Sequence, residues 1–196
     1  DLTVPLLGRQ YPLKLLSYLQ RDLSRCARGD LDKAMKMVPR AKSRLARFAL
    51  LVCAPDHQAA RDHLFAALTH NPLLKNRLYQ VSEAHLSADR ILESIESHEQ
   101  RISWHLYRMY RVRNQLVHEG TSATYIDMLV ENLHAYVLRI LQLVEEALGD
   151  PPRPPSLDAA ILKITLEHRS HTQVLQRGGV EPVSDESVEA FIFGSA

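Results

Sequence analysis

The chain has 196 residues, of which 45% are hydrophobic and 24% charged, and its formal net charge is +1. This composition excludes collagen-like and low-complexity chains and predicts one globular domain with appendages, or two very small domains. The longest apolar run, around Phe48–Ala54, is far shorter than the roughly 18–20 residues of a membrane span. No secretory signal is visible at the start of the chain, so we expect a cytoplasmic protein with no membrane association.

Helical spacing of apolar residues, interrupted by glycine and proline, predicts an all-α protein. Residues 1–11 are expected to be irregular. Helices are predicted over residues 13–28, 31–54, 56–70, 72–86, 88–118, 123–148 and 157–176, with a last turn over 187–193 that docks onto the bundle. Gly29 is predicted to end the first helix and Asp30 to cap the second, which Pro39 should kink or split. Asn71 is the expected N-cap of the helix that begins at residue 72.

Long helices joined by short loops predict an antiparallel helical bundle. The predicted organisation is an N-terminal helical extension (1–29), the bundle (30–149), a Pro-rich linker (150–156) and a C-terminal helix with its tail (157–196). The helix over 88–118 is the clearest element, because one apolar stripe runs along it. The stripe comprises Ile91, Ile95, Ile102, Leu106, Met109 and Leu116.

The charge is unevenly distributed along the chain. Residues 1–50 hold 11 Lys and Arg against 4 Asp and Glu, whereas residues 145–196 hold 4 against 9. A basic first quarter can attract a phosphate backbone, and it can equally be the solvated face of amphipathic helices. Cys26 and Cys53 are the only cysteines, too few for a disulfide framework or a zinc site, and we expect free thiols in a reducing compartment.

The end of the helix over 88–118 carries an unusual concentration of polar residues. Within eleven positions it holds Arg108, Arg111, Arg113, Asn114 and His118, and Gly120 follows. Arg113, followed at once by Asn114 and after four intervening residues by His118, resembles the signature of HEPN domains. The wider string over 110–120, Tyr-Arg-Val-Arg-Asn-Gln-Leu-Val-His-Glu-Gly, is most similar to the Apea-like branch of that family.

The resemblance implies an all-helical module of the kind found in toxins and defence proteins, many of which cut RNA without a metal or other cofactor. It implies that Arg113 and His118 carry catalysis, with Asn114 as the polar helper. Arg108 and Arg111 lie outside the pattern, and we assign them at most to contacts with the RNA backbone. The implied partners are RNA, a second copy bound through the motif helix, and further domains of a longer chain, which agrees with a sequence that begins at Asp1.

These residue types suit metal-free RNA cleavage. The ribose 2′-hydroxyl attacks the adjacent phosphorus, a histidine transfers the proton near neutral pH, and an arginine stabilises the charge that grows on the phosphoryl oxygens. The products are a 2′,3′-cyclic phosphate and a 5′-hydroxyl. On an ideal helix, however, Arg113 and His118 point about 140° apart. Either the last turn unwinds before Gly120, or the target lies in a groove between two chains.

Several alternatives remain open at this point. Arg113 can instead pair with a carboxylate such as Glu93 or Glu131, and His118 can be an exposed residue favoured by the helix dipole. The whole domain can be a non-catalytic module that dimerises and binds nucleotide, RNA or a partner, or the neutralised half of a toxin–antitoxin pair.

Other side chains carry less specific signals. Trp104, Tyr107 and Tyr110 can stack on bases or pack at a helix interface. The histidine pairs 98/105 and 168/171 are expected to be core, interface or surface residues rather than metal ligands.

Overall fold

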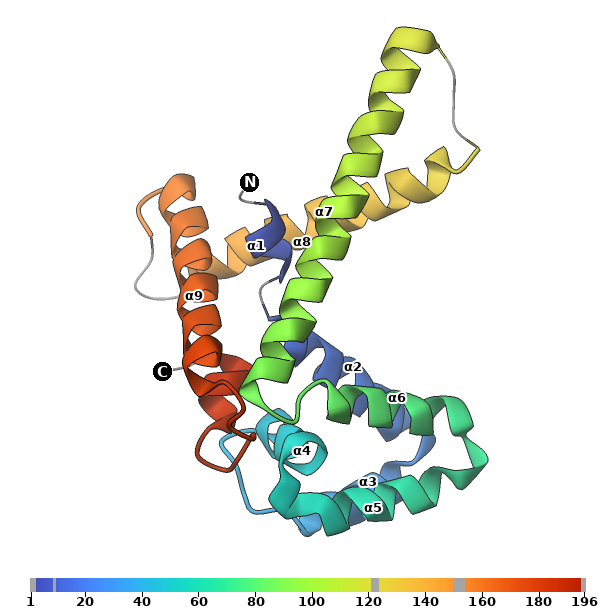
Figure 1. The fold of residues 1–196 in the computed structure, drawn as a ribbon, viewed down its shortest axis with the longest axis vertical. Helices are drawn as coiled ribbons and strands as arrows, with labels where there is room; N and C mark the ends of the chain where they lie inside the picture. Colours follow the sequence, from blue (N-terminus) through green and yellow to red (C-terminus); the bar gives the residue numbers. More distant parts are fainter. Residues whose placement is uncertain (1–2, 9, 121–123, 150–153, 195–196) are drawn as a thin grey trace. The chain divides into compact units, whose positions relative to one another are not determined.

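The computed structural model describes residues 3–8, 10–120, 124–149 and 154–194. The all-α class is confirmed, since the described residues contain no strand and only one isolated β-bridge, between Ser87 and Pro182 (Figure 1). None of the helices in these ranges combines the length and apolar character that crossing a membrane requires. The Pro-rich segment over 150–153 lies outside the described residues.

The elements follow the predicted order with shifted bounds. They are α1 (Thr3–Gly8), α2 (Tyr11–Cys26), α3 (Arg28–Lys36), α4 (Arg44–Cys53), the 3-10 turn η1 (Pro55–His57), α5 (Gln58–Ala67), the 3-10 turn η2 (Leu68–His70), α6 (Pro72–Glu83), α7 (Ala88–Glu119), α8 (Ile126–Gly149), α9 (Leu157–Gly178) and the π-helical turn η3 (Glu189–Phe193).

The chain forms two compact units. The core unit comprises the described residues of 10–95 and 170–196, and the hairpin unit those of 1–9 and 96–169. Helices α7 and α9 each pass from one unit into the other.

Two local predictions near the N-terminus are wrong. Residues 3–8 form α1 rather than an irregular segment, because Pro5 sits in the first turn, where a missing N–H costs nothing, and Leu6 and Leu7 are buried. The break between α2 and α3 falls at Ala27, whose backbone leaves the helical region and whose N–H donates to the carbonyl of Leu23. Gly29 therefore lies inside α3 instead of ending α2.

The helix boundaries predicted at Pro39 and Asn71 are confirmed. The segment containing Pro39 is non-helical and separates α3 from α4, as predicted. The hydroxyl of Ser43 accepts the N–H of Ala46 at 3.0 Å at the start of α4, and the side-chain carbonyl of Asn71 accepts that of Leu74 at 3.1 Å at the start of α6.

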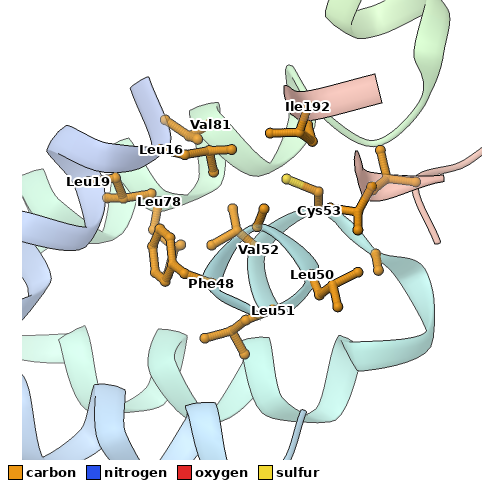
Figure 2. Close-up of a cluster of buried hydrophobic side chains, with 14 of the residues drawn as sticks. Leu16, Leu19, Phe48, Leu50, Leu51, Val52, Cys53, Leu78, Val81 and Ile192 are labelled. Carbon is orange, nitrogen blue, oxygen red and sulfur yellow. The ribbon is translucent and has the colours of Figure 1, made fainter. Parts of the chain in front are cut away.

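The core unit is built around α4. All six residues of Phe48–Cys53 are buried, so this helix is apolar on every side and must be surrounded by others. Figure 2 shows α4 end-on, with side chains such as Leu16 of α2, Leu78 of α6 and Ile192 of η3 around it. The last turn thus docks onto the helical core, as expected from its sequence.

Buried polar side chains donate hydrogen bonds to the backbone carbonyls at the end of α4. The guanidinium of Arg61, itself only 4% exposed, donates to the carbonyls of Val52 at 3.0 Å and Ala54 at 3.1 Å, and the hydroxyl of Ser82 donates to Val52 at 2.8 Å. The carbonyls that end a helix lack partners within it, so these bonds allow the helix to end inside the protein. Burial lowers the pKa of Arg61.

The hairpin unit has a smaller core. It consists of Leu6, Leu143, Val144, Ala147, Ala160 and Ile164. Helices α7 and α8 meet where His105 Nδ1 lies 2.8 Å from the hydroxyl of Tyr136. From this crossing the end of α7 and the start of α8 diverge (Figure 1), so they do not pack along their length.

Candidate functional site

The motif residues occupy the last three turns of α7. This helix runs unbroken from Ala88 to Glu119, and Gly120 follows with a φ of 64°, a left-handed conformation that suits glycine. Unwinding of the last turn before Gly120, one of the two solutions considered for the motif, is therefore wrong. Arg113 and His118 remain on different flanks of one helix, about 140° apart.

Asn114 links the two flanks. Its side-chain carbonyl accepts a hydrogen bond from Arg113 Nη1 at 3.1 Å, and its position is only about 40° from that of His118 around the helix axis. The bond therefore draws the guanidinium toward the side of the helix that carries His118. Two of the five N–H donors of an arginine fork suffice for a phosphate, so the guanidinium keeps donors for an anion while it is bound to Asn114.

The two residues proposed for catalysis are accessible. Arg113 and His118 are exposed, and Asn114 is half-buried. Among the described residues, no carboxylate pairs with Arg113: Glu93 lies 3.4 Å from Arg90, and Glu131 is exposed. The interpretation of Arg113 as half of an ion pair with either glutamate is thus wrong for the single chain, whereas His118 is indeed an exposed residue in the last turn.

The two additional arginines differ in their surroundings. The guanidinium of Arg108 lies over the ring of Tyr125 at 5.1 Å, a cation–π contact between α7 and the residue directly before α8. Arg111 is exposed, and no described residue forms an ion pair or hydrogen bond with its side chain. Arg111 is therefore the better placed of the two for contact with a phosphate backbone.

An exposed aromatic surface continues from the motif along α7. Trp104, Tyr107 and Tyr110 are 66%, 61% and 63% exposed, so none of them packs at an interface within the single chain. At 100° per residue, Tyr107 and His118 fall on one face about 60° wide, together with Arg111 and Asn114. The sequence analysis did not identify this face, although its spacing of four, three and four residues is visible in the sequence.

The histidines of the pairs 98/105 and 168/171 have local partners. His105 contacts Tyr136, His168 Nε2 lies 2.7 Å from Glu99 Oε1, and His171 Nε2 lies 2.8 Å from the carbonyl of Phe191. His171 is buried and the His168 side chain is only 10% exposed, so the expectation of a surface pair is wrong. No group of three or more His, Cys, Asp or Glu side chains arranged to hold a metal ion occurs in the part of the chain that the structure describes.

Comparison of the chain with protein-family models, with curated proteins and with solved structures finds no match. The assignment of the candidate site therefore rests on the residues of this chain and their geometry.

Proposed function

We propose that this protein is a metal-independent endoribonuclease of the HEPN type that acts as a homodimer through α7. The observation that carries the proposal is the accessible set of Arg113, Asn114 and His118 at the end of an unbroken helix, with the arginine bonded to the asparagine. The resemblance of the motif adds a setting, a toxin or anti-phage defence system in the cytoplasm, with other domains in a longer chain.

Each residue has a defined role in this mechanism. His118 takes the proton of the attacking 2′-hydroxyl or gives one to the leaving 5′-oxygen, and Arg113 stabilises the charge on the phosphoryl oxygens. Asn114 orients the guanidinium. Arg111 contacts the backbone of the strand, and Arg108, which lies over Tyr125, contributes a weaker attraction. Single-stranded loops are the expected substrate, because their backbone can adopt the in-line geometry that cleavage needs.

Uncovered apolar side chains support the dimer. Val117, Met128 and Val130 are 58%, 51% and 58% exposed, and Leu133 and Val137, which flank the crossing of α7 and α8 at Tyr136, are 45% and 46% exposed. Val130, Leu133 and Val137 fall within about 60° of one another around the axis of α8, and an exposed apolar stripe of this kind is typical of an interface. A second copy of α7 and α8 would cover it, and a groove between two α7 helices is the remaining solution to the 140° separation of Arg113 and His118.

Cleavage of RNA in the presence of EDTA tests the enzyme. We expect wild-type protein to produce 2′,3′-cyclic phosphate ends, and His118→Ala and Arg113→Ala each to reduce the rate by about 100-fold or more. His70→Ala is the matched control, since His70 is an exposed histidine of η2 in the core unit whose side chain forms no hydrogen bond or ion pair with a described residue. Equal cleavage by all four proteins, or none by any, would remove the nuclease assignment.

The dimer is tested separately by light scattering. The double substitution Leu133→Glu and Val137→Glu places charges on the uncovered surface of α8 and should give a monomer that no longer cleaves RNA. Leu73→Glu is the control, because Leu73 of α6 is 83% exposed in the core unit and the change adds a charge there. A wild-type protein that is already monomeric at micromolar concentration contradicts the dimer.

A second candidate is a non-catalytic module that binds RNA. The exposed Trp104 and Tyr107, next to Arg111, favour this alternative, because stacking and charge bind a strand without requiring the chemistry of His118. Retained RNA binding without cleavage by any protein form identifies it.

A further inference from the structure

Five of the 11 lysines and arginines in residues 1–50 line a cavity in the core unit. The cavity has a volume of about 540 Å³, within the usual range for ligand sites, and lies between the end of α3, the segment that follows it and the start of α4. Its charged lining residues are Asp32, Lys36, Arg40, Lys42, Arg44 and Arg47, with a net charge of +4. Few acidic groups are thus present to neutralise the cations.

Two of the arginines build the walls. Arg47 donates from Nε at 3.0 Å and from Nη2 at 2.5 Å to the carbonyl of Val38, which fixes the segment between α3 and α4. Arg44 Nη2 lies 2.9 Å from Asp32 Oδ1 and so joins α4 to α3. These contacts fix the shape of the cavity without a ligand.

The other three cations are available for binding. Lys36, Arg40 and Lys42 are exposed. Among the described residues, Lys36 and Arg40 have no side-chain partner, and Lys42 has only a long contact of 3.9 Å with Glu189 while its side chain is 79% exposed. Lys36, Arg40 and the weakly paired Lys42 line one cavity and repel each other, and an anion between them removes that repulsion.

We propose that this cavity binds the phosphate groups of a single-stranded nucleic acid, which in the proposed function is the RNA substrate. Of the described residues that line the cavity, none is aromatic, so it has no surface on which to stack a base. Contacts limited to phosphates hold a strand without reading its sequence. The choice of RNA among polyanions rests on the proposed function, whereas the phosphate chemistry rests on the cavity alone.

Fluorescence anisotropy with a labelled 2′-O-methyl RNA dodecamer, which lacks the attacking hydroxyl, measures binding without cleavage. In the full chain, the combined substitutions Lys36→Ala, Arg40→Ala and Lys42→Ala should weaken binding by about 100-fold at 0.1 M salt, since each phosphate contact contributes a factor of about 5 there. The slope of log affinity against log salt concentration should become shallower by about 2 units.

The matched control removes the same charge elsewhere. Arg25→Ala, Arg28→Ala and Lys75→Ala change three exposed cations of the core unit whose side chains form no hydrogen bond or ion pair with a described residue and which do not line the cavity. Circular dichroism establishes that both triple variants retain the helical fold. Equal losses of affinity in the two variants, or wild-type affinity and slope in the cavity variant, overturn the proposal.

Two further outcomes separate the possible failures. If ATP displaces the dodecamer as well as unlabelled strand does at equal phosphate concentration, the cavity takes a free nucleotide and the strand assignment is overturned. If wild-type protein never cleaves RNA but the cavity variant alone loses strand binding, the proposed function fails and the phosphate site stands. If wild-type protein cleaves RNA and the cavity variant binds the strand normally, the phosphate site fails and the proposed function stands.

Discussion

Acidification is expected to destabilise the core unit through one buried histidine. The ring of His85 is fully buried, its Nδ1 lies 2.7 Å from the carbonyl of Val81, and its Nε2 has no hydrogen-bond partner among the described residues. Burial disfavours the charged ring and lowers the pKa of His85 from 6.5 to about 4. The folded protein therefore keeps this side chain neutral at pH values where an exposed histidine is charged.

The sign and size of the effect follow from this difference in pKa. Between pH 6.5 and 4 the unfolded chain binds a proton at His85 that the folded chain does not, so the free energy of unfolding falls as the pH falls. Above pH 6.5 the ring of His85 does not reduce the free energy of unfolding. By pH 4.5 the difference in proton binding at His85 has lowered the free energy of unfolding by about 2.5 kcal/mol, since each pKa unit corresponds to about 1.4 kcal/mol.

Urea unfolding followed by circular dichroism at pH 7.5 and 4.5 measures this loss. The variant His85→Asn keeps an N–H in the position that donates to Val81 and cannot be charged in this range. Other titrating groups are shared by both proteins, so wild type should lose about 2.5 kcal/mol more than the variant between the two pH values. A loss that is the same in both proteins would refute the reasoning.

Two further predictions concern packing in the core unit. Gly178→Ala should destabilise the fold by about 1–3 kcal/mol, because a Cβ there would lie 2.8 Å from a ring carbon of Phe191. Gly29→Ala, in open space inside α3, should stabilise the fold by about 0.5–1 kcal/mol. Thermal unfolding measures both changes, and a lower melting temperature for Gly29→Ala than for Gly178→Ala contradicts them. Cys26 should react with a thiol reagent in the folded protein and Cys53 only on unfolding, because burial removes access and raises the pKa of the Cys53 thiol; rapid reaction of both thiols contradicts the burial of α4.

Most of the helices could be predicted because their signals are local. Asn71 and Ser156 are residues that favour N-caps, and they predict where α6 and α9 begin. The side chains of both accept backbone N–H groups in the first turns of these helices. By contrast, α1 is too short to be stable alone and forms because Leu6 packs into the small core of the hairpin unit, a contact that local sequence does not encode. The break at Ala27 likewise has no local signal.

One functional surface could likewise be predicted from local sequence, and another could not. The face shared by Tyr107, Arg111 and His118 is fixed once α7 is a regular helix, so the sequence contains it. The basic cavity is different. An excess of cations in residues 1–50 predicts attraction to phosphate but not where the charges gather, since that depends on how Arg47 and Arg44 hold the segment between two helices.

The continuity of α7 determines what the motif can do. A regular helix fixes Arg113 and His118 on different flanks, and no rotation of the helix turns both toward one phosphate. The hydrogen bond to Asn114 reduces this separation by drawing the guanidinium toward the histidine side, but the two backbones stay where they are. In the proposed homodimer, two copies of α7 packed across a two-fold axis would present both flanks to the same groove. The same assembly would also bury exposed apolar side chains of α8 such as Leu133 and Val137.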